Sequence, residues 1–150
     1  MADVILTNMV MIVDKKNKKV LVQDRINSYK GLSFPGGHIE GNESFYDSAV
    51  REVKEETGLT VRNLKSSGVI HWVDKKTADR YIVFLYKTSE YEGTLRKESE
   101  EGMHMWMDLD ELMNSPSTNG LLDYLPMFLD KGYSEAYAPY TDKNIEVFYK

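Results

Sequence analysis

Most of what this sequence indicates about function lies in the stretch Gly37-His-Ile-Glu-Gly-Asn-Glu43-Ser-Phe-Tyr-Asp-Ser-Ala-Val-Arg51-Glu52-Val-Lys-Glu55-Glu56-Thr-Gly58-Leu59. Glu52, Glu55 and Glu56 are spaced i, i+3 and i+4, which places three carboxylates on one face of a helix. Carboxylates this close repel one another, and a hard, oxygen-seeking cation such as Mg²⁺ offsets that repulsion. The alternative is the solvated acidic face of an ordinary surface helix.

The flanking residues predict one amphipathic helix over residues 45–57. Ser44 followed by Asp47 is typical of a helix N-cap, and Gly58 stands where a left-handed C-cap is expected. The acidic triplet then lies in the last turns, at the negative end of the helix dipole, where carboxylates are disfavoured. Helix stability alone therefore does not explain the triplet. The glycines of the preceding turn, Phe34-Pro-Gly-Gly37, let the backbone approach a ligand or the helix closely.

This stretch resembles the signature of the Nudix hydrolases, which reads Gly, five residues, Glu, seven residues, Arg-Glu-apolar-x-Glu-Glu-x-Gly-apolar. Every specified position is matched, by Gly37, Glu43, Arg51, Glu52, Val53, Glu55, Glu56, Gly58 and Leu59. A chance match in a chain of 150 residues is on the order of one in ten million. The surrounding pattern of strands and helices is also similar, so we expect one Nudix domain over residues 1–150.

The resemblance implies a set of metal ligands, namely the Gly37 carbonyl, Glu52, Glu55, Glu56 and the loop acid Glu101. It implies Mg²⁺ as the cofactor, with Mn²⁺ as the alternative. Glu52 is the first candidate for the general base, and Glu101 stays open as the second. Arg51 cannot lose its proton, so we expect it to pair with Glu43 and hold the metal-binding face in place. The alternative for that pair is a plain surface ion pair.

The bulk composition is that of an ordinary globular chain, 41% hydrophobic and 29% charged. A net charge of −5 argues against a nucleic-acid polymer or a membrane surface as partner, since both favour a basic patch. It does not argue against a nucleotide, because a metal can supply positive charge. Cysteine is absent, which excludes disulfides, and neither a signal peptide nor a long apolar run is present. We therefore expect a cytoplasmic protein.

The hydrophobic patterns predict a mixed α+β fold, because strands outnumber helices and the helices are not regularly interleaved. Strands are expected over residues 4–13, 20–23, 61–73 with a break near 66–68, 80–91, 103–107 and 145–149. Beyond residues 45–57, helices are expected from residue 108 and from residue 121 to about 131. The resemblance implies an α/β/α sandwich around a mixed sheet, with a catalytic loop-helix-loop.

Within the family, this chain resembles the MutT-like group, which includes 8-oxo-dGTP diphosphatases. By that resemblance Arg25 would contact phosphate, Phe34 and Trp106 would flank the base, and Asn119 would hydrogen-bond its edge. Each has a simpler interpretation. Arg25 could be a surface residue, the two aromatics could belong to the core, and Asn119-Gly120 is a good turn dipeptide without any ligand.

The sequence thus predicts Mg²⁺-dependent hydrolysis of a nucleoside triphosphate to the monophosphate and pyrophosphate, with 8-oxo-dGTP as the leading substrate and nucleotide-pool sanitation as the role. One alternative is a Nudix hydrolase of another nucleoside diphosphate derivative. The other is a non-catalytic nucleotide sensor, whose expected mark is a broken acidic triplet. The triplet here is intact. Base preference, sugar preference and oligomeric state stay open.

Overall fold

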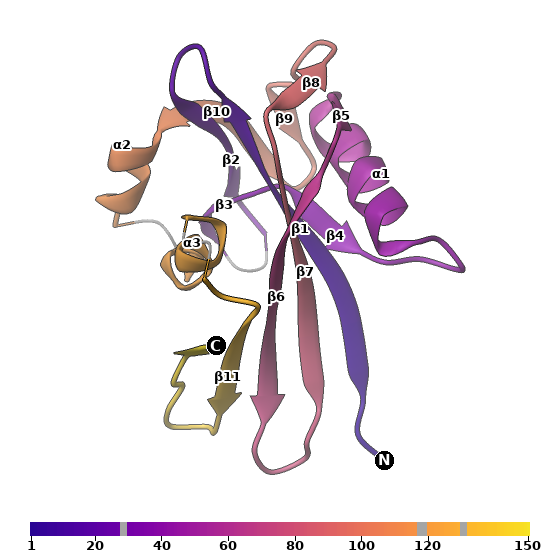
Figure 1. Cartoon of the computed structure of the whole chain (residues 1–150), viewed down its shortest axis with the longest axis vertical. Helices are drawn as coiled ribbons and strands as arrows, with labels where there is room; N and C mark the ends of the chain where they lie inside the picture. Colours follow the sequence, from indigo (N-terminus) through magenta and orange to yellow (C-terminus); the bar gives the residue numbers. More distant parts are fainter. Residues whose placement is uncertain (28–29, 117–119, 130–131) are drawn as a thin grey trace.

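The computed structural model describes residues 1–27, 30–116, 120–129 and 132–150, which form a mixed β-sheet and three helices (Figure 1). The helices are α1 (Phe45–Thr57), α2 (Leu109–Met113) and α3 (Leu121–Leu129). The strands are β1 (Val4–Asp14), β2 (Lys19–Arg25), β3 (Gly31–Ser33), β4 (Gly36–His38), β5 (Thr60–Arg62), β6 (Lys65–Asp74), β7 (Arg80–Thr88), β8 (Glu90–Glu92), β9 (Glu98–Ser99), β10 (Gly102–Asp108), β11 (Glu135–Tyr140) and β12 (Phe148–Tyr149).

The main sheet has the order β12-β11-β6-β7-β1-β2-β10-β9 among the described residues, with β3 beside β2 and β4 beside β1. The pairs β1–β7 and β6–β11 are parallel and the other pairs of this sheet are antiparallel. The predicted mixed sheet is therefore confirmed. β5 and β8 form a separate two-stranded sheet.

Both faces of the sheet carry a hydrophobic core, because successive strand residues point to opposite faces. Val10 and Ile12 of β1 pack with Ala49 and Val53 of α1. Met11, between them, belongs to the core on the other face, where α3 contributes Leu121, Leu125, Met127 and Phe128. α1 and α3 therefore lie on opposite sides of the sheet, and the predicted α/β/α arrangement is confirmed.

The structure also differs from the sequence prediction at several strands. β11 was not predicted, and it joins the sheet parallel to β6. The predicted strand over 80–91 is divided, because β7 ends at Thr88 and β8 pairs with β5 instead. The expected strand over 61–73 is likewise divided between β5 and β6, and the predicted break matches a β-bulge between Ser66 and Val69. None of the described helices is both long and apolar enough to cross a bilayer.

Candidate active site

Both ends of α1 are fixed by contacts that the sequence predicted. The Asp47 backbone N–H donates to Ser44 Oγ at 2.9 Å, which makes Ser44 the N-cap. Gly58 ends the helix in the left-handed conformation, with φ of 83°. Arg96, which no sequence pattern indicated, donates from Nη1 to the Glu55 carbonyl at 2.6 Å. A cation at this end complements the helix dipole.

Arg51 gathers the carboxylates of this helix into one network. It donates to both oxygens of Glu43, at 3.0 Å from Nε and 2.7 Å from Nη2. Its Nη1 also donates to Glu52 at 3.0 Å and to Glu55 at 3.1 Å, and Nη2 to the His38 carbonyl at 3.0 Å. Hydrogen bonds from Arg51 lower the pKa of Glu43 to about 2. The predicted Arg51–Glu43 pair is thus present, and it is part of a larger arrangement.

The glycine turn lies directly against this network. A Cβ at Gly37 would clash with the Glu52 carboxylate, so any larger residue there would displace that carboxylate. Asn8 Oδ1 accepts from the Gly37 N–H at 3.2 Å, and Asn8 Nδ2 donates to Ser48 Oγ on α1 at 2.9 Å. Buried Asn8 therefore ties the turn to the helix. Its signal in the sequence is a polar residue inside an otherwise apolar strand.

Glu56 is the buried member of the acidic triplet, with 8% of its surface exposed. Burial, together with the negative charges of Glu52 and Glu101, raises the pKa of Glu56 to about 8. The Gly36 N–H donates to Glu56 at a long 3.4 Å. Arg25 forms an ion pair with Glu101 at 3.2 Å and lowers the pKa of Glu56 through its charge. The structure therefore brings Arg25 and Glu101, distant in sequence, to the end of α1.

These residues fit a hard divalent cation by their chemistry. The donor set consists of oxygen atoms, and a buried carboxylate beside two other carboxylates is stabilised by positive charge. Within the described residues, no three His, Cys, Asp or Glu side chains converge as a metal-binding group. Arg51 instead forms ion pairs with Glu43, Glu52 and Glu55. The ligand set of Gly37, Glu52, Glu55, Glu56 and Glu101 stays a prediction.

The residues expected at the base are not brought together. Phe34 is 2% exposed and packs edge-on against Phe128 in the core on the α3 side, with ring centroids 5.4 Å apart. Trp106 packs against the core on the α1 side, 5.2 Å from the Tyr91 ring. The sheet separates them, so the two rings do not face one common site, and a role of either ring at the base stays a prediction. Asn119 lies outside the described residues.

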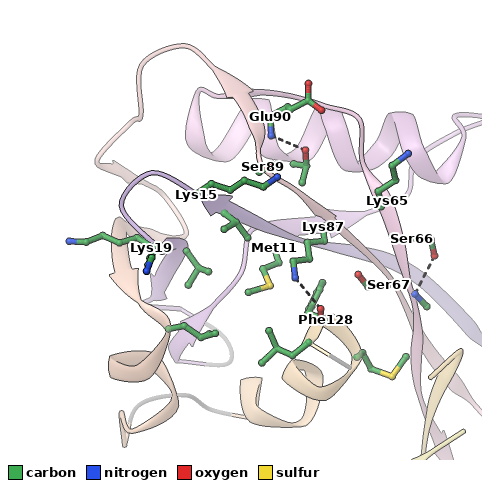
Figure 2. A pocket seen from close by; sticks show the side chains of 18 of the residues that line it. Met11, Lys15, Lys19, Lys65, Ser66, Ser67, Lys87, Ser89, Glu90 and Phe128 are labelled. Atoms are coloured by element: carbon green, nitrogen blue, oxygen red, sulfur yellow. Dashed lines mark hydrogen bonds between the residues drawn. The ribbon is translucent and has the colours of Figure 1, made fainter. Parts of the chain in front are cut away.

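A cavity of about 1400 Å³ opens elsewhere, between the β1–β2 turn, β6, β7 and the helices α2 and α3 (Figure 2). Its walls include Met11 and Phe128 together with Lys65 and Lys87, and Lys87 Nζ donates to the Phe128 carbonyl at 3.2 Å. The residues of the Arg51 network are not among the described residues that line it. The cavity and the carboxylates bound by Arg51 thus belong to different parts of the molecule.

Comparison with known proteins identifies the family. The NUDIX domain profile matches residues 6–128, more than half of the chain, so the chain belongs to the NUDIX domain family. The matched range contains α1, the glycine turn, Arg25 and Glu101, while β11 and β12 follow it. Proteins of this family generally use divalent metal cations.

Two relatives and one solved structure illustrate the similarity. An uncharacterized Nudix hydrolase, YvcI of Bacillus subtilis, is 34% identical over 97 residues, which cover 61% of each chain. An 8-oxo-dGTP diphosphatase of Buchnera aphidicola is 33% identical over 119 residues, covering 75% of this chain and 87% of that protein. The crystal structure of a MutT protein from Bacillus halodurans superimposes with a TM-score of 0.78 at 25% identity, covering 95% and 97% of the chains. This chain spans less than two thirds of the length of several relatives that it matches.

Proposed function

We propose that this protein is a divalent-metal-dependent pyrophosphohydrolase that cleaves a nucleoside triphosphate between its α and β phosphates. Mg²⁺ is the proposed metal and 8-oxo-dGTP the leading substrate. The observation that carries the proposal is the Arg51 network, which holds Glu43, Glu52 and Glu55 together beside Gly37 while Glu56 lies buried behind them. The 8-oxo-dGTP diphosphatase relative supports the choice of substrate.

The reaction adds water across a phosphoric anhydride and releases the monophosphate and pyrophosphate. The Gly37 carbonyl, Glu52, Glu55, Glu56 and Glu101 would hold the metal, which when bound neutralises phosphate charge and acidifies water. Glu52 is the first candidate to take the proton of the attacking water, since burial raises its pKa, and Glu101 is the second.

Two arginines have different proposed roles. Arg51 fixes the orientation of Glu52 through the 3.0 Å hydrogen bond, so it is a positioning residue in this scheme. Arg25 offers its charge to a phosphate from the end of β2, next to Glu101. In both cases the planar guanidinium suits bidentate contacts with oxygen pairs.

The test is pyrophosphate release with Mg²⁺ across a nucleotide panel, using this protein and Glu52→Gln. The panel holds 8-oxo-dGTP, the ordinary deoxynucleoside and ribonucleoside triphosphates, ADP-ribose and a dinucleoside tetraphosphate, with products separated by chromatography. We expect 8-oxo-dGTP to be turned over much faster than the others, and Glu52→Gln to lose several orders of magnitude. Glu111→Gln, an exposed glutamate on α2, is the matched control and should keep full activity.

Other outcomes assign the protein differently. Faster turnover of ADP-ribose or the tetraphosphate would make it a hydrolase of another nucleoside diphosphate derivative. Calorimetric binding of a nucleotide with no turnover of any panel member would contradict the enzyme and support the nucleotide sensor.

A further inference from the structure

One face of the main sheet is apolar where α1 does not cover it. A single cross-strand row runs over five strands, because each residue pairs with the next: Leu6, Ile82, His71, Tyr137 and Phe148. Leu6 lies two residues before Asn8, whose side chain contacts α1, so this row points to the α1 side. Four of its five members are apolar or aromatic.

The adjacent row continues this surface. Phe84 pairs with Asn8 on one side and Val69 on the other, and its ring stacks on Phe45 of α1 at 3.9 Å between centroids. Phe45 is 41% exposed, and Phe148, at the far edge of the face, is 43% exposed. We call the surface of Leu6, Phe45, Val69, Ile82, Phe84, Tyr137 and Phe148 the open face.

Apart from Phe45 at the start of α1, the helices leave the open face uncovered in the described part of the chain. α1 contacts mainly β1, β4 and β5, and α3 contacts β6, β7 and β11 through the core on the opposite side. Figure 1 shows α1 beside the upper part of the sheet, while the lower parts of β6, β7 and β1 extend beyond it. Monomers seldom expose a broad apolar patch of this kind without a partner.

The total surface of the chain is also larger than its mass requires. The accessible surface is 8886 Å², whereas a compact monomer of 17.3 kDa exposes about 7,800 Å². The excess of about 1,000 Å² is close to the roughly 800 Å² that each partner buries in a standard protein interface. A second chain with an interface of ordinary size would bury an area of this order.

The charges on the open face are arranged for a second copy of the same chain. His71 Nε2 contacts Glu135 at 2.8 Å, and Arg80 Nη1 contacts His71 Nδ1 at 3.2 Å, so His71 lies between one cation and one anion. A two-fold axis passing over His71 would place Arg80 of one copy against Glu135 of the other, twice. Self-complementarity of this kind is what a symmetric dimer interface requires.

We propose that the open face is the interface of a homodimer, with the two sheets packed face to face around His71. The test is the mass of the full chain by sedimentation and light scattering, from micromolar to submillimolar concentration. We expect twice the 17.3 kDa of one chain. Ile82→Glu, at the centre of the row, should raise the dimer dissociation constant at least ~10-fold, because it buries an unpaired charge in the interface.

Leu122→Glu is the matched control, since Leu122 is 43% exposed on α3, on the other side of the sheet. It should leave the dimer unchanged. A charge exchange tests the symmetry without adding a charge to the apolar row: Arg80→Glu should weaken the dimer, and Arg80→Glu with Glu135→Arg should restore it. Circular dichroism checks that each variant is folded.

A wild-type mass of one chain at every concentration would overturn the proposal, whether or not another protein or a vesicle binds this face. A dimer that Leu122→Glu and Ile82→Glu weaken equally would place the interface elsewhere. Pyrophosphate release is measured separately, so loss of the dimer and loss of the proposed activity are distinguishable.

Discussion

At the scale of single residues, Arg51 determines how the carboxylates of α1 are arranged. Its guanidinium reaches three side chains and one backbone carbonyl, which needs several donors in one plane. A lysine ammonium keeps the charge and lacks this fork. The network is therefore expected to need an arginine at position 51. A lysine, which would keep only the positive charge, is expected to disrupt it.

We expect Arg51→Lys to lower kcat by roughly 100-fold, since a misplaced catalytic group costs about that much. The melting temperature should change little. Arg62→Lys is the control, because Arg62 pairs with Glu92 at 3.3 Å with both side chains more than half exposed. Steady-state kinetics on the fastest substrate of the panel measures the difference. Equal rates for the two variants would show that Arg51 contributes only charge.

Glu56 gives a pH dependence to the metal-free protein. Its pKa is raised from 4.5 to about 8 by burial, so the folded state binds a proton that the unfolded state releases. The contribution of this proton to the free energy of unfolding is therefore fully present below about pH 4.5. It is lost as pH rises toward 8. The slope from one such group is at most ~1.4 kcal/mol per pH unit.

Urea unfolding at several pH values, in the presence of a chelator, measures this effect. Glu56→Gln cannot ionise, so it should remove this part of the slope and be the more stable protein at pH 8. Divalent cations should stabilise the unsubstituted protein most at high pH, where the carboxylate is charged. An unchanged slope in Glu56→Gln would assign the dependence to other groups.

At the scale of the element, α1 presents the candidate site because its ends are fixed. The Ser44 hydroxyl satisfies one backbone donor of the first turn, and that bond also sets where the helix begins relative to Glu43. The helix start and the Arg51–Glu43 pair are therefore linked through one residue. Asn8 fixes the same helix from the sheet through Ser48.

We expect Ser44→Ala to lower the free energy of unfolding by ~1 kcal/mol, the usual cost of losing an N-cap side chain. Ser44→Asp should retain stability, because aspartate caps helices as well as serine. Chemical denaturation of the three proteins tests both statements. If Ser44→Asp were as unstable as Ser44→Ala, the hydroxyl would have another role.

At the scale of the whole molecule, β11 completes the sheet from a distant part of the chain. It pairs with β6 along six residues, and its Ala136 and Ala138 are fully buried. Small side chains are needed there because Ala136 packs in the α3-side core. The sheet therefore depends on a strand that follows the matched family range.

We expect Ala136→Leu to destabilise the protein by ~1–3 kcal/mol, the usual cost of overpacking a core. Ala2→Leu, the same change at an exposed position, should have little effect. Thermal unfolding compares the two. Equal melting temperatures would show that the core around Ala136 accommodates the larger side chain.

The sequence predicted the features that depend on neighbouring residues. The helix over residues 45–57, its two caps and the Arg51–Glu43 pair follow from spacing within one turn and one helix, where geometry is regular. The strands over 4–13 and 103–107 were also predicted, since their apolar patterns are continuous or alternate. β11 was missed because Glu-Ala-Tyr-Ala-Pro-Tyr contains proline and small residues, which weaken a strand pattern.

By itself, then, the sequence determined helix α1, its acidic face and the class of fold, because each is encoded in local periodicity and caps. Only the tertiary structure decided that Arg25 and Glu101 pair and lie near enough to Glu56 to shift its pKa, since β2 and β10 pair in one register. It also decided that Phe34 and Trp106 lie on opposite faces, and that, in the described residues, the helices cover the open face only at Phe45. These features depend on strand order and register, which join residues far apart in the chain.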